Sequence, residues 1–322
     1  MSTTAPEAGP CTHGALPRFR SLVARRPLTT FLVLVLGLVY PLISLPVLAA
    51  HGVIPGASLF TALHVAPDEA AGLVLSVVLF GSSLTVTWAT EGPAGVRTLL
   101  RRMRRWRVGW GWWSAALLGV PVVGVLVSLL LGDSLTPVAP LRFVSGQLLL
   151  LGVNLLLVNL WEETAWSGIL QTRLERQHSL PVAALLTAIP FALVHWPLSL
   201  FGTPTVASVG WALVGYLVLG VLFRPMLAVF LRGGRDSVLL VAVLHSVFNR
   251  TNNPDGVLAG MTANRGADGW AILVTMVVVA AGAALVLRRR LGRAYRAELD
   301  ATSTTGSITT GSITGSPAGL RT

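Results

Sequence analysis

The chain has 322 residues, of which 53% are hydrophobic and only 11% charged, and its mean hydropathy is +0.72. Soluble domains carry about 25% charged residues, so this composition excludes an ordinary soluble protein and predicts an all-α polytopic membrane protein. The net charge of +11 also occurs in nucleic-acid-binding proteins, but the 24 basic residues, all arginine, lie mainly in short segments between apolar runs. That distribution indicates contact with an anionic membrane surface and no nucleic acid partner.

Eight apolar segments predict about eight transmembrane helices. Segment 237–249 is short and contains a histidine and an asparagine, so we expect either a buried span or a re-entrant segment there. The other seven segments are long enough to cross the hydrocarbon core. They are 28–50, 70–90, 109–131, 142–162, 181–200, 205–231 and 269–287.

The arginines alternate between the two sides of these spans. All but Arg142, Arg250 and Arg265 fall on the side of the N-terminus, and Arg224 is assigned to that side as a residue at the end of the sixth span. The positive-inside rule then predicts a multi-pass protein of the cell membrane with both termini cytoplasmic. We expect residues 1–27 to form a cytoplasmic segment, 28–290 a membrane domain, and the Thr/Ser/Gly-rich 291–322 a cytoplasmic, largely disordered tail.

Five polar residues stand out within the apolar spans. Glu162 and Glu163 end the fourth span, and a carboxylate inside hydrocarbon costs about 2.5–3.5 kcal/mol, which makes it a candidate functional residue. His195 follows Phe191 by four positions, and Asn249 follows His245 by four, so each pair shares a helix face. An acid pair, two histidines and an amide on three helices could activate water and bind an oxyanion.

Each of these residues also has an explanation without catalysis. A single histidine in a membrane helix can hydrogen-bond to a neighbouring helix, and Asn249 could cap a helix end. The glutamates could lie in water at the cytoplasmic boundary. A small transporter that relays protons through Glu and His is a further alternative, although no inverted repeat is visible in the sequence.

The order and spacing of these residues resemble the three motifs of the CAAX-protease and bacteriocin-processing (CPBP, or Abi) family of intramembrane proteases. The motifs are Glu-Glu-x-x-x-Arg, Phe-x-x-x-His and His-x-x-x-Asn or Asp on successive membrane helices. Glu162 begins the first, Phe191 to His195 matches the second, and His245 to Asn249 matches the third. The resemblance covers a core of about residues 142–250.

The resemblance implies an endopeptidase that acts on a peptide or membrane-protein substrate at the membrane lipid. Glu162 would be the general base toward water, with His195 orienting or sharing that proton. His245 and Asn249 would donate hydrogen bonds to the oxyanion. The scheme favoured by Asn249 uses no cofactor, while Glu162, His195 and His245 would be the ligands in a zinc-dependent version.

One position departs from the family pattern. The family's arginine falls at Ser167, where an arginine would pair with Glu163 one helical turn away. Arg173 lies about 15 Å further along the helix, and Arg250, beside Asn249, is a candidate partner from another helix. The alternative to an active protease is therefore an impaired family member that serves as a membrane scaffold or bacteriocin-immunity-type protein.

Overall fold

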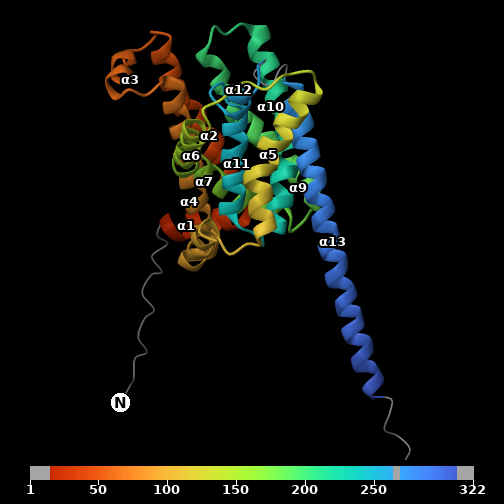
Figure 1. The fold of residues 1–322 in the computed structure, drawn as a ribbon. Helices are drawn as coiled ribbons and strands as arrows, with labels where there is room; N and C mark the ends of the chain where they lie inside the picture. Colours follow the sequence, from red (N-terminus) through yellow and green to blue (C-terminus); the bar gives the residue numbers. More distant parts are fainter. Residues whose placement is uncertain (1–14, 264–268, 310–322) are drawn as a thin grey trace, which may run out of the picture.

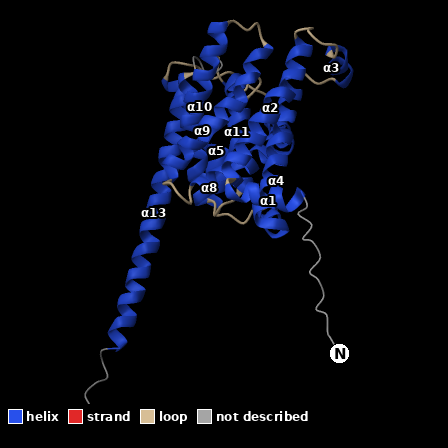
Figure 2. Ribbon diagram, turned by 180° about the vertical axis from the view of Figure 1, so that it is seen from behind, coloured by secondary structure: helices blue, strands red, loops and turns tan. Residues whose placement is uncertain are grey.

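The computed structural model describes residues 15–263 and 269–309, and all regular secondary structure in these residues is helical (Figures 1 and 2). The first half of the chain comprises α1 (Ala15–Arg25), α2 (Pro27–Ala50), α3 (Ala57–Leu63), α4 (Pro67–Met103) and α5 (Trp110–Leu130). One long helix follows, with two π-helical turns in it: α6 (Pro140–Asn154), η1 (Leu155–Asn159), α7 (Leu160–Ala165), η2 (Trp166–Gln171) and α8 (Thr172–Leu174). The remainder comprises α9 (Leu180–His195), the 3-10 turn η3 (Trp196–Phe201), α10 (Val206–Gly233), α11 (Val238–Asn252), α12 (Val257–Met261) and α13 (Trp270–Thr309).

Seven of these helical segments are long and apolar enough to cross a membrane, which confirms the multi-pass membrane class and the seven long predicted spans. Two of them are longer than predicted. The second continues through a bend at Gly92 and Pro93 to Met103, and the fourth extends from Pro140 to Leu174 instead of ending at residue 162. Gly92 adopts φ +67°, and Pro93 lacks the N–H needed for a regular turn, so the helix bends there without ending.

The eighth predicted span is α11, a helix of 15 residues that is buried along most of its length. It begins next to Arg105, whose carbonyl accepts a hydrogen bond from Ser237 Oγ (2.6 Å). It leads to α12, where Met261 O accepts a hydrogen bond from Thr136 N in the loop after α5. Arg105 lies in the loop before α5 and Thr136 in the loop after it, at opposite ends of that helix. Helix α11 therefore passes through the bundle, inside a shell of longer helices. Burial by α5, α7 and α10 makes the short length tolerable.

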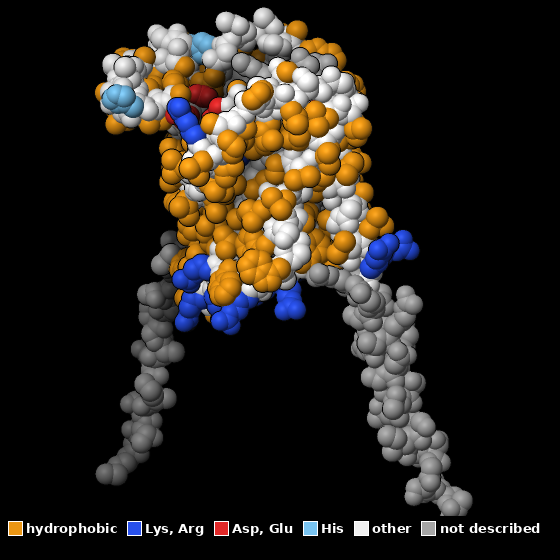
Figure 3. Space-filling view, in the orientation of Figure 1, with side chains coloured by type: hydrophobic (Ala, Val, Ile, Leu, Met, Phe, Trp, Pro, Cys, Tyr) orange, Lys and Arg blue, Asp and Glu red, His pale blue; other side chains and the backbone are white. Residues whose placement is uncertain are grey.

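The two ends of the described chain lie on the same side of the bundle, where α1 precedes the first span and α13 leaves the last (Figure 1). Most arginine side chains visible in Figure 3 also gather at that end. One arginine was assigned to the wrong environment, because Arg224 is fully buried in α10 instead of lying at a membrane surface. Helix α13 continues to Thr309, through part of the segment whose composition predicts disorder, and residues 310–322 lie outside the described residues.

Helix α10 packs closely against α9, and Gly220 makes that approach possible. A Cβ atom at Gly220 would lie 3.1 Å from the carbonyl oxygen and 3.3 Å from the Cβ of Ala188. Small residues at such crossings let membrane helices make van der Waals contact along their backbones. Because Arg224 follows one turn later, this contact also fixes the position of its side chain.

We expect Gly220→Leu to destabilise the protein, because the added side chain would force α9 and α10 apart, at a cost of about 1–3 kcal/mol. Thermal unfolding of the purified protein in detergent measures this effect. Gly215→Leu is the matched control, since Gly215 lies on the same helix and a Cβ there meets nothing within 4 Å. Equal unfolding temperatures for the two variants would contradict the packing role of Gly220.

Candidate active site

The two glutamates lie between the π-helical turns η1 and η2 of the long fourth span. In an α-helix, residues four apart drift by about 40° around the axis, and the wider π turns offset that drift. Accordingly, Asn159, Glu163, Ser167 and Gln171 are all fully buried, although they recur every four residues through 12 positions. The π turns thus direct a row of polar side chains into the bundle, and such turns are frequent at functional sites.

Glu163 is fully buried and is bound by three side chains. Arg224 Nη1 lies 2.8 Å from Oε1 and 3.1 Å from Oε2, and His245 Nδ1 lies 2.9 Å from Oε1. Ser167 Oγ donates to Oε2 (2.5 Å) and accepts from Arg224 Nη2 (3.0 Å). A buried carboxylate is tolerable only when it is paired and hydrogen-bonded, and this one is both.

Arg224 supplies the cation that the sequence pattern lacks at Ser167. Its guanidinium reaches Glu163 from α10, and Ser167 bridges the pair. Arg250 does not serve this purpose, because its guanidinium binds Gln147 Oε1 (3.0 Å) and Asp255 Oδ1 (3.0 Å). The hydrogen bond from Arg250 holds the pKa of Asp255 below its usual range. An arginine on another helix, Arg224, therefore takes the place of the arginine expected at position 167.

Glu162 is 3% exposed, and its Oε2 lies 4.0 Å from His245 Nδ1. The two glutamates thus flank the same imidazole edge, but only Glu163 is within hydrogen-bonding distance of it. The unequal surroundings follow from their positions on the helix, since adjacent residues differ by about 100° around the axis. Glu163 is held by an arginine, a histidine and a serine, whereas Glu162 has no such set of partners.

Glu162 is also deeper than the sequence suggests. The fourth span continues for 12 residues beyond it to Leu174, which is about 18 Å of helix. The site therefore lies inside the bundle and not at its boundary with water. His195, at the end of α9, is brought to a comparable depth because α9 starts at the end of the bundle where α8 stops.

Phe191 lies at the centre of the site, between the two histidines. Its ring centroid lies 4.3 Å from that of His195 and 6.4 Å from that of His245, and the Arg224 guanidinium lies 5.7 Å from the same ring. Trp166 and Phe223 close the apolar surroundings. The phenylalanine of the second motif thus contacts both histidines and the Arg224 guanidinium.

His195 has a defined tautomer in this setting. Its Nδ1 lies 2.7 Å from the carbonyl oxygen of Phe191, which can only accept, so Nδ1 carries the proton. Nε2 is then unprotonated in the neutral ring and can accept a hydrogen bond. His245 Nδ1 also carries a proton, because it lies 2.9 Å from Oε1 of the Glu163 carboxylate, which can only accept.

Asn249 lies one turn after His245 and is held by a second polar group. Its Nδ2 donates to Asn159 Oδ1 at 3.5 Å, and Ser246 Oγ donates to the same oxygen at 2.9 Å. Asn159 is fully buried on η1, one turn before Glu163. One N–H of the Asn249 amide remains for another acceptor.

Sequence reasoning missed Arg224, Asn159 and Ser246. A signal for Arg224 was present, because seven residues follow it, Pro225 to Leu231, with no further charge, which makes a position at a span boundary unfavourable. Asn159 was detectable as the first member of the polar row at four-residue spacing. Ser246 had no distinguishing signal, since a serine beside a histidine is common in apolar helices.

The zinc-dependent version requires at least three side chains that converge on one metal ion. Among the residues that the structure describes, no group of three His, Cys, Asp or Glu side chains is placed to hold a metal ion. The version with Glu162, His195 and His245 as zinc ligands therefore stays a prediction.

Fold and site together define a multi-pass membrane protein with a buried acid–histidine–amide cluster. Residues 144–251 match a family model described as type II CAAX prenyl endopeptidase Rce1-like, a model of the CPBP family. The match contains every candidate site residue and nearly coincides with the expected core 142–250. The family that this model describes is one of proteases. No curated protein matches the chain.

Proposed function

We propose that the protein is an intramembrane endopeptidase that cleaves a peptide bond near the cytoplasmic face of the membrane, with both termini cytoplasmic. The observation that carries the proposal is the buried cluster of Glu162, Glu163, His245 and Arg224 within the Rce1-like match. Burying two carboxyl groups beside a histidine in an apolar interior costs free energy, and a role in hydrolysis explains why such a cluster is present.

In the proposed mechanism, Glu162 accepts a proton from the water that attacks the peptide carbonyl. His195 Nε2 accepts a second hydrogen bond from that water and orients it, which its tautomer permits. The tetrahedral oxyanion receives hydrogen bonds from His245 Nε2–H and from the second N–H of Asn249. The proton then passes to the leaving amine, and the peptide bond breaks.

Charge balance supports these roles. When Glu162 and Glu163 are ionised, Arg224 and a doubly protonated His245 neutralise them, so the buried cluster has no net charge. A doubly protonated His245 has an N–H on each nitrogen, so it can bind Glu163 through Nδ1 and the oxyanion through Nε2. Glu163 and Arg224 hold His245 in position and do not touch the substrate.

The alternative role as a catalytically impaired scaffold was based on Ser167. Since Arg224 and Ser167 together bind Glu163, the absence of the local arginine is no longer a reason to expect inactivity. The substrate class named by the family model is the prenylated C-terminal CAAX peptide, and we propose it as the first class to test.

The test uses the purified full-length protein in lipid nanodiscs with quenched fluorescent peptides. One set of peptides carries a farnesylated C-terminal CAAX sequence, and the matched set lacks the prenyl group. We expect cleavage of at least one set by the wild-type protein and cleavage at least about 10²-fold slower by Glu162→Gln. Cleavage by Glu162→Gln at the wild-type rate would remove the proposed mechanism.

The metal-free scheme also predicts that cleavage does not change after incubation with EDTA or 1,10-phenanthroline followed by removal of the chelator. The reason is that Glu162, His195 and His245 act through protons and hydrogen bonds in this scheme. Initial rates before and after treatment measure the effect. Loss of activity that added zinc restores would favour the metal-dependent alternative.

A further inference from the structure

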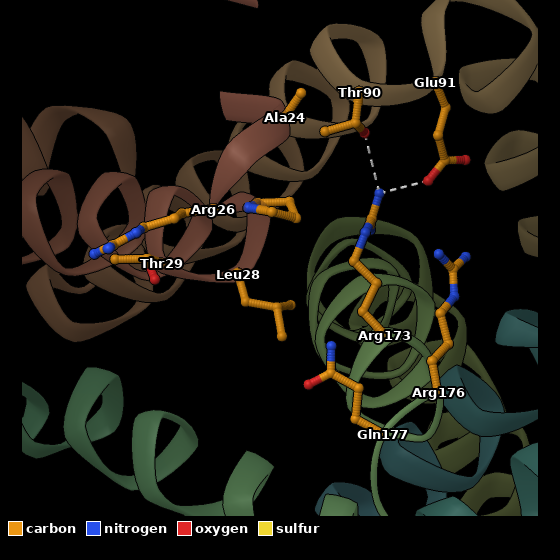
Figure 4. Close-up of a pocket in the computed structure, with 10 residues that line it drawn as sticks. Ala24, Arg26, Leu28, Thr29, Thr90, Glu91, Arg173, Arg176 and Gln177 are labelled. Carbon is orange, nitrogen blue, oxygen red and sulfur yellow. Dashed lines mark hydrogen bonds and ion pairs between the residues drawn. The ribbon is translucent and has the colours of Figure 1, made fainter. Parts of the chain in front are cut away.

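A polar cavity lies outside the candidate active site, at the end of the bundle where α1 and α8 lie. Its volume is about 410 Å³, and it opens between the α1–α2 junction, the bend of α4 and the end of α8 (Figure 4). Three arginines line it, Arg26, Arg173 and Arg176, against a single carboxylate, Glu91. The lining therefore carries an excess of positive charge.

The arginines differ in how far they are neutralised. Arg173 is 8% exposed and binds Glu91 Oε1 at 2.7 Å and Thr90 Oγ1 at 3.5 Å. Arg26 and Arg176 are exposed, and within the described part of the chain neither side chain has an acceptor or counter-ion. Figure 4 shows Arg176 beside Arg173, whereas Arg26 lies on the opposite wall and points away from them. Its long, exposed side chain can turn toward a ligand.

The start of α2 adds hydrogen-bond donors to this wall. The 24-residue helix begins with Pro27, and in its first turn Thr30 N donates a hydrogen bond to Arg26 O (2.9 Å). The N–H groups of Leu28 and Thr29, both in the lining, have no acceptor among the described residues. Free N–H groups and the positive end of a long helix dipole favour an anion.

The depth of the cavity indicates where such an anion would come from. The first membrane span starts at Pro27, so this residue marks the membrane surface. Helix α1, just before it, exposes Phe19 and Leu22 together with Arg20 and Arg25, a pattern typical of a helix lying in the headgroup region. Lipid phosphates occupy the same region.

We propose that this cavity binds a phosphate group, supplied by the headgroup of an anionic lipid. Arg176 and Arg26 would contact the phosphate oxygens as charge-assisted donors, and the N–H groups of Leu28 and Thr29 would complete the shell. Arg173 adds positive charge while remaining bound to Glu91. The site joins α1 and α2, which lie outside the Rce1-like match, to α8 within it.

The experiment measures binding to the full-length protein in a neutral detergent by thermal shift. The probes are dioctanoyl-phosphatidylglycerol, dioctanoyl-phosphatidylcholine and inorganic phosphate. We expect phosphatidylglycerol to raise the unfolding temperature of the wild type and phosphatidylcholine to have no effect. Arg26→Gln/Arg176→Gln should weaken the apparent affinity by about tenfold or more, since two charged hydrogen-bond donors are lost.

Two further variants make the result specific. Arg97→Gln/Arg101→Gln removes the same charge from exposed residues of α4 outside the lining, so it should bind like the wild type. Glu91→Gln removes the carboxylate that competes for Arg173, so it should bind more tightly. Equal losses in the two double variants would overturn the site, because binding would then depend on overall charge. Inorganic phosphate as effective as phosphatidylglycerol would support the phosphate chemistry and overturn the lipid source.

Discussion

Arg224→Ser is expected to destabilise the protein and to lower cleavage by about 10²-fold, because Glu163 would lose its cation and His245 its fixed position. Removing one partner of a buried ion pair costs about 3–5 kcal/mol, since the other charge stays buried without compensation. The measurements are thermal unfolding in detergent and kcat/KM on a cleaved peptide. Arg232→Ser is the matched control, because Arg232 lies two turns further along α10 and forms a half-exposed ion pair with Glu175.

A variant that exchanges the two residues separates positioning from folding. Ser167→Arg/Arg224→Ser restores the family's arginine one turn after Glu163 and keeps the composition unchanged. The exchange is feasible because Arg224 Nη2 lies 3.0 Å from Ser167 Oγ, so the two side chains occupy adjoining space. We expect each single variant to be impaired and the exchange to recover much of the stability and activity, as for strongly coupled neighbours.

Arg224→Lys adds a second measure of the same role. A lysine keeps the charge but cannot reach both Glu163 and Ser167 as a planar fork does, so we expect a folded protein with slower cleavage. An exchange variant no better than the worse single variant, together with full activity in Arg224→Lys, would contradict the assignment of Arg224 as the partner that positions Glu163.

Glu162→Gln and His195→Ala are each expected to lower kcat/KM by about 10²–10⁴-fold, the usual contribution of a positioned acid or base. Stability should change little in Glu162→Gln, because the amide has nearly the same shape and Glu162 makes only a 4.0 Å approach to His245. His178→Ala is the control for His195→Ala, since His178 is an exposed histidine before α9. The measurements are initial rates at several substrate concentrations and thermal unfolding of each variant.

These variants also distinguish the proposed enzyme from a scaffold or a proton relay. If Glu162 is the base, its loss should reduce kcat and leave substrate binding nearly unchanged. A variant that binds the peptide less tightly but cleaves it at the original kcat would place Glu162 in substrate recognition instead of catalysis.

Much of the fold followed from the sequence because spans are set by local properties. The length of each apolar segment predicted the seven long spans, and seven helices long and apolar enough to cross a membrane confirm them. The composition of α11 left two possibilities, a buried span or a re-entrant segment, since His245 and Asn249 require shielding from lipid. The extent of the fourth span did not follow. Its continuation past Glu162 and Glu163 depends on partners for those carboxylates, and the partners come from other helices.

The glutamate pair and the two histidine motifs were predictable because each is a local pattern at helical spacing. The partner of Glu163 was not predictable in the same way. Arg224 is 61 positions away and reaches Glu163 only because α10 packs on α9 with Gly220 at the contact. Within a single helix, the pattern of spacing identifies only partners three or four residues away. Four residues after Glu163, the residue is Ser167.

The sequence by itself therefore determined the membrane class and the seven long spans, and it predicted the residues of the candidate site, since these depend on hydrophobicity and on spacing within a helix. The tertiary structure decided which charges are paired, how deep the site lies and that a serine and a distant arginine together replace a local one. The reason is physical. Pairing of buried charges depends on which helices pack together, and that packing is fixed only when the whole bundle has formed.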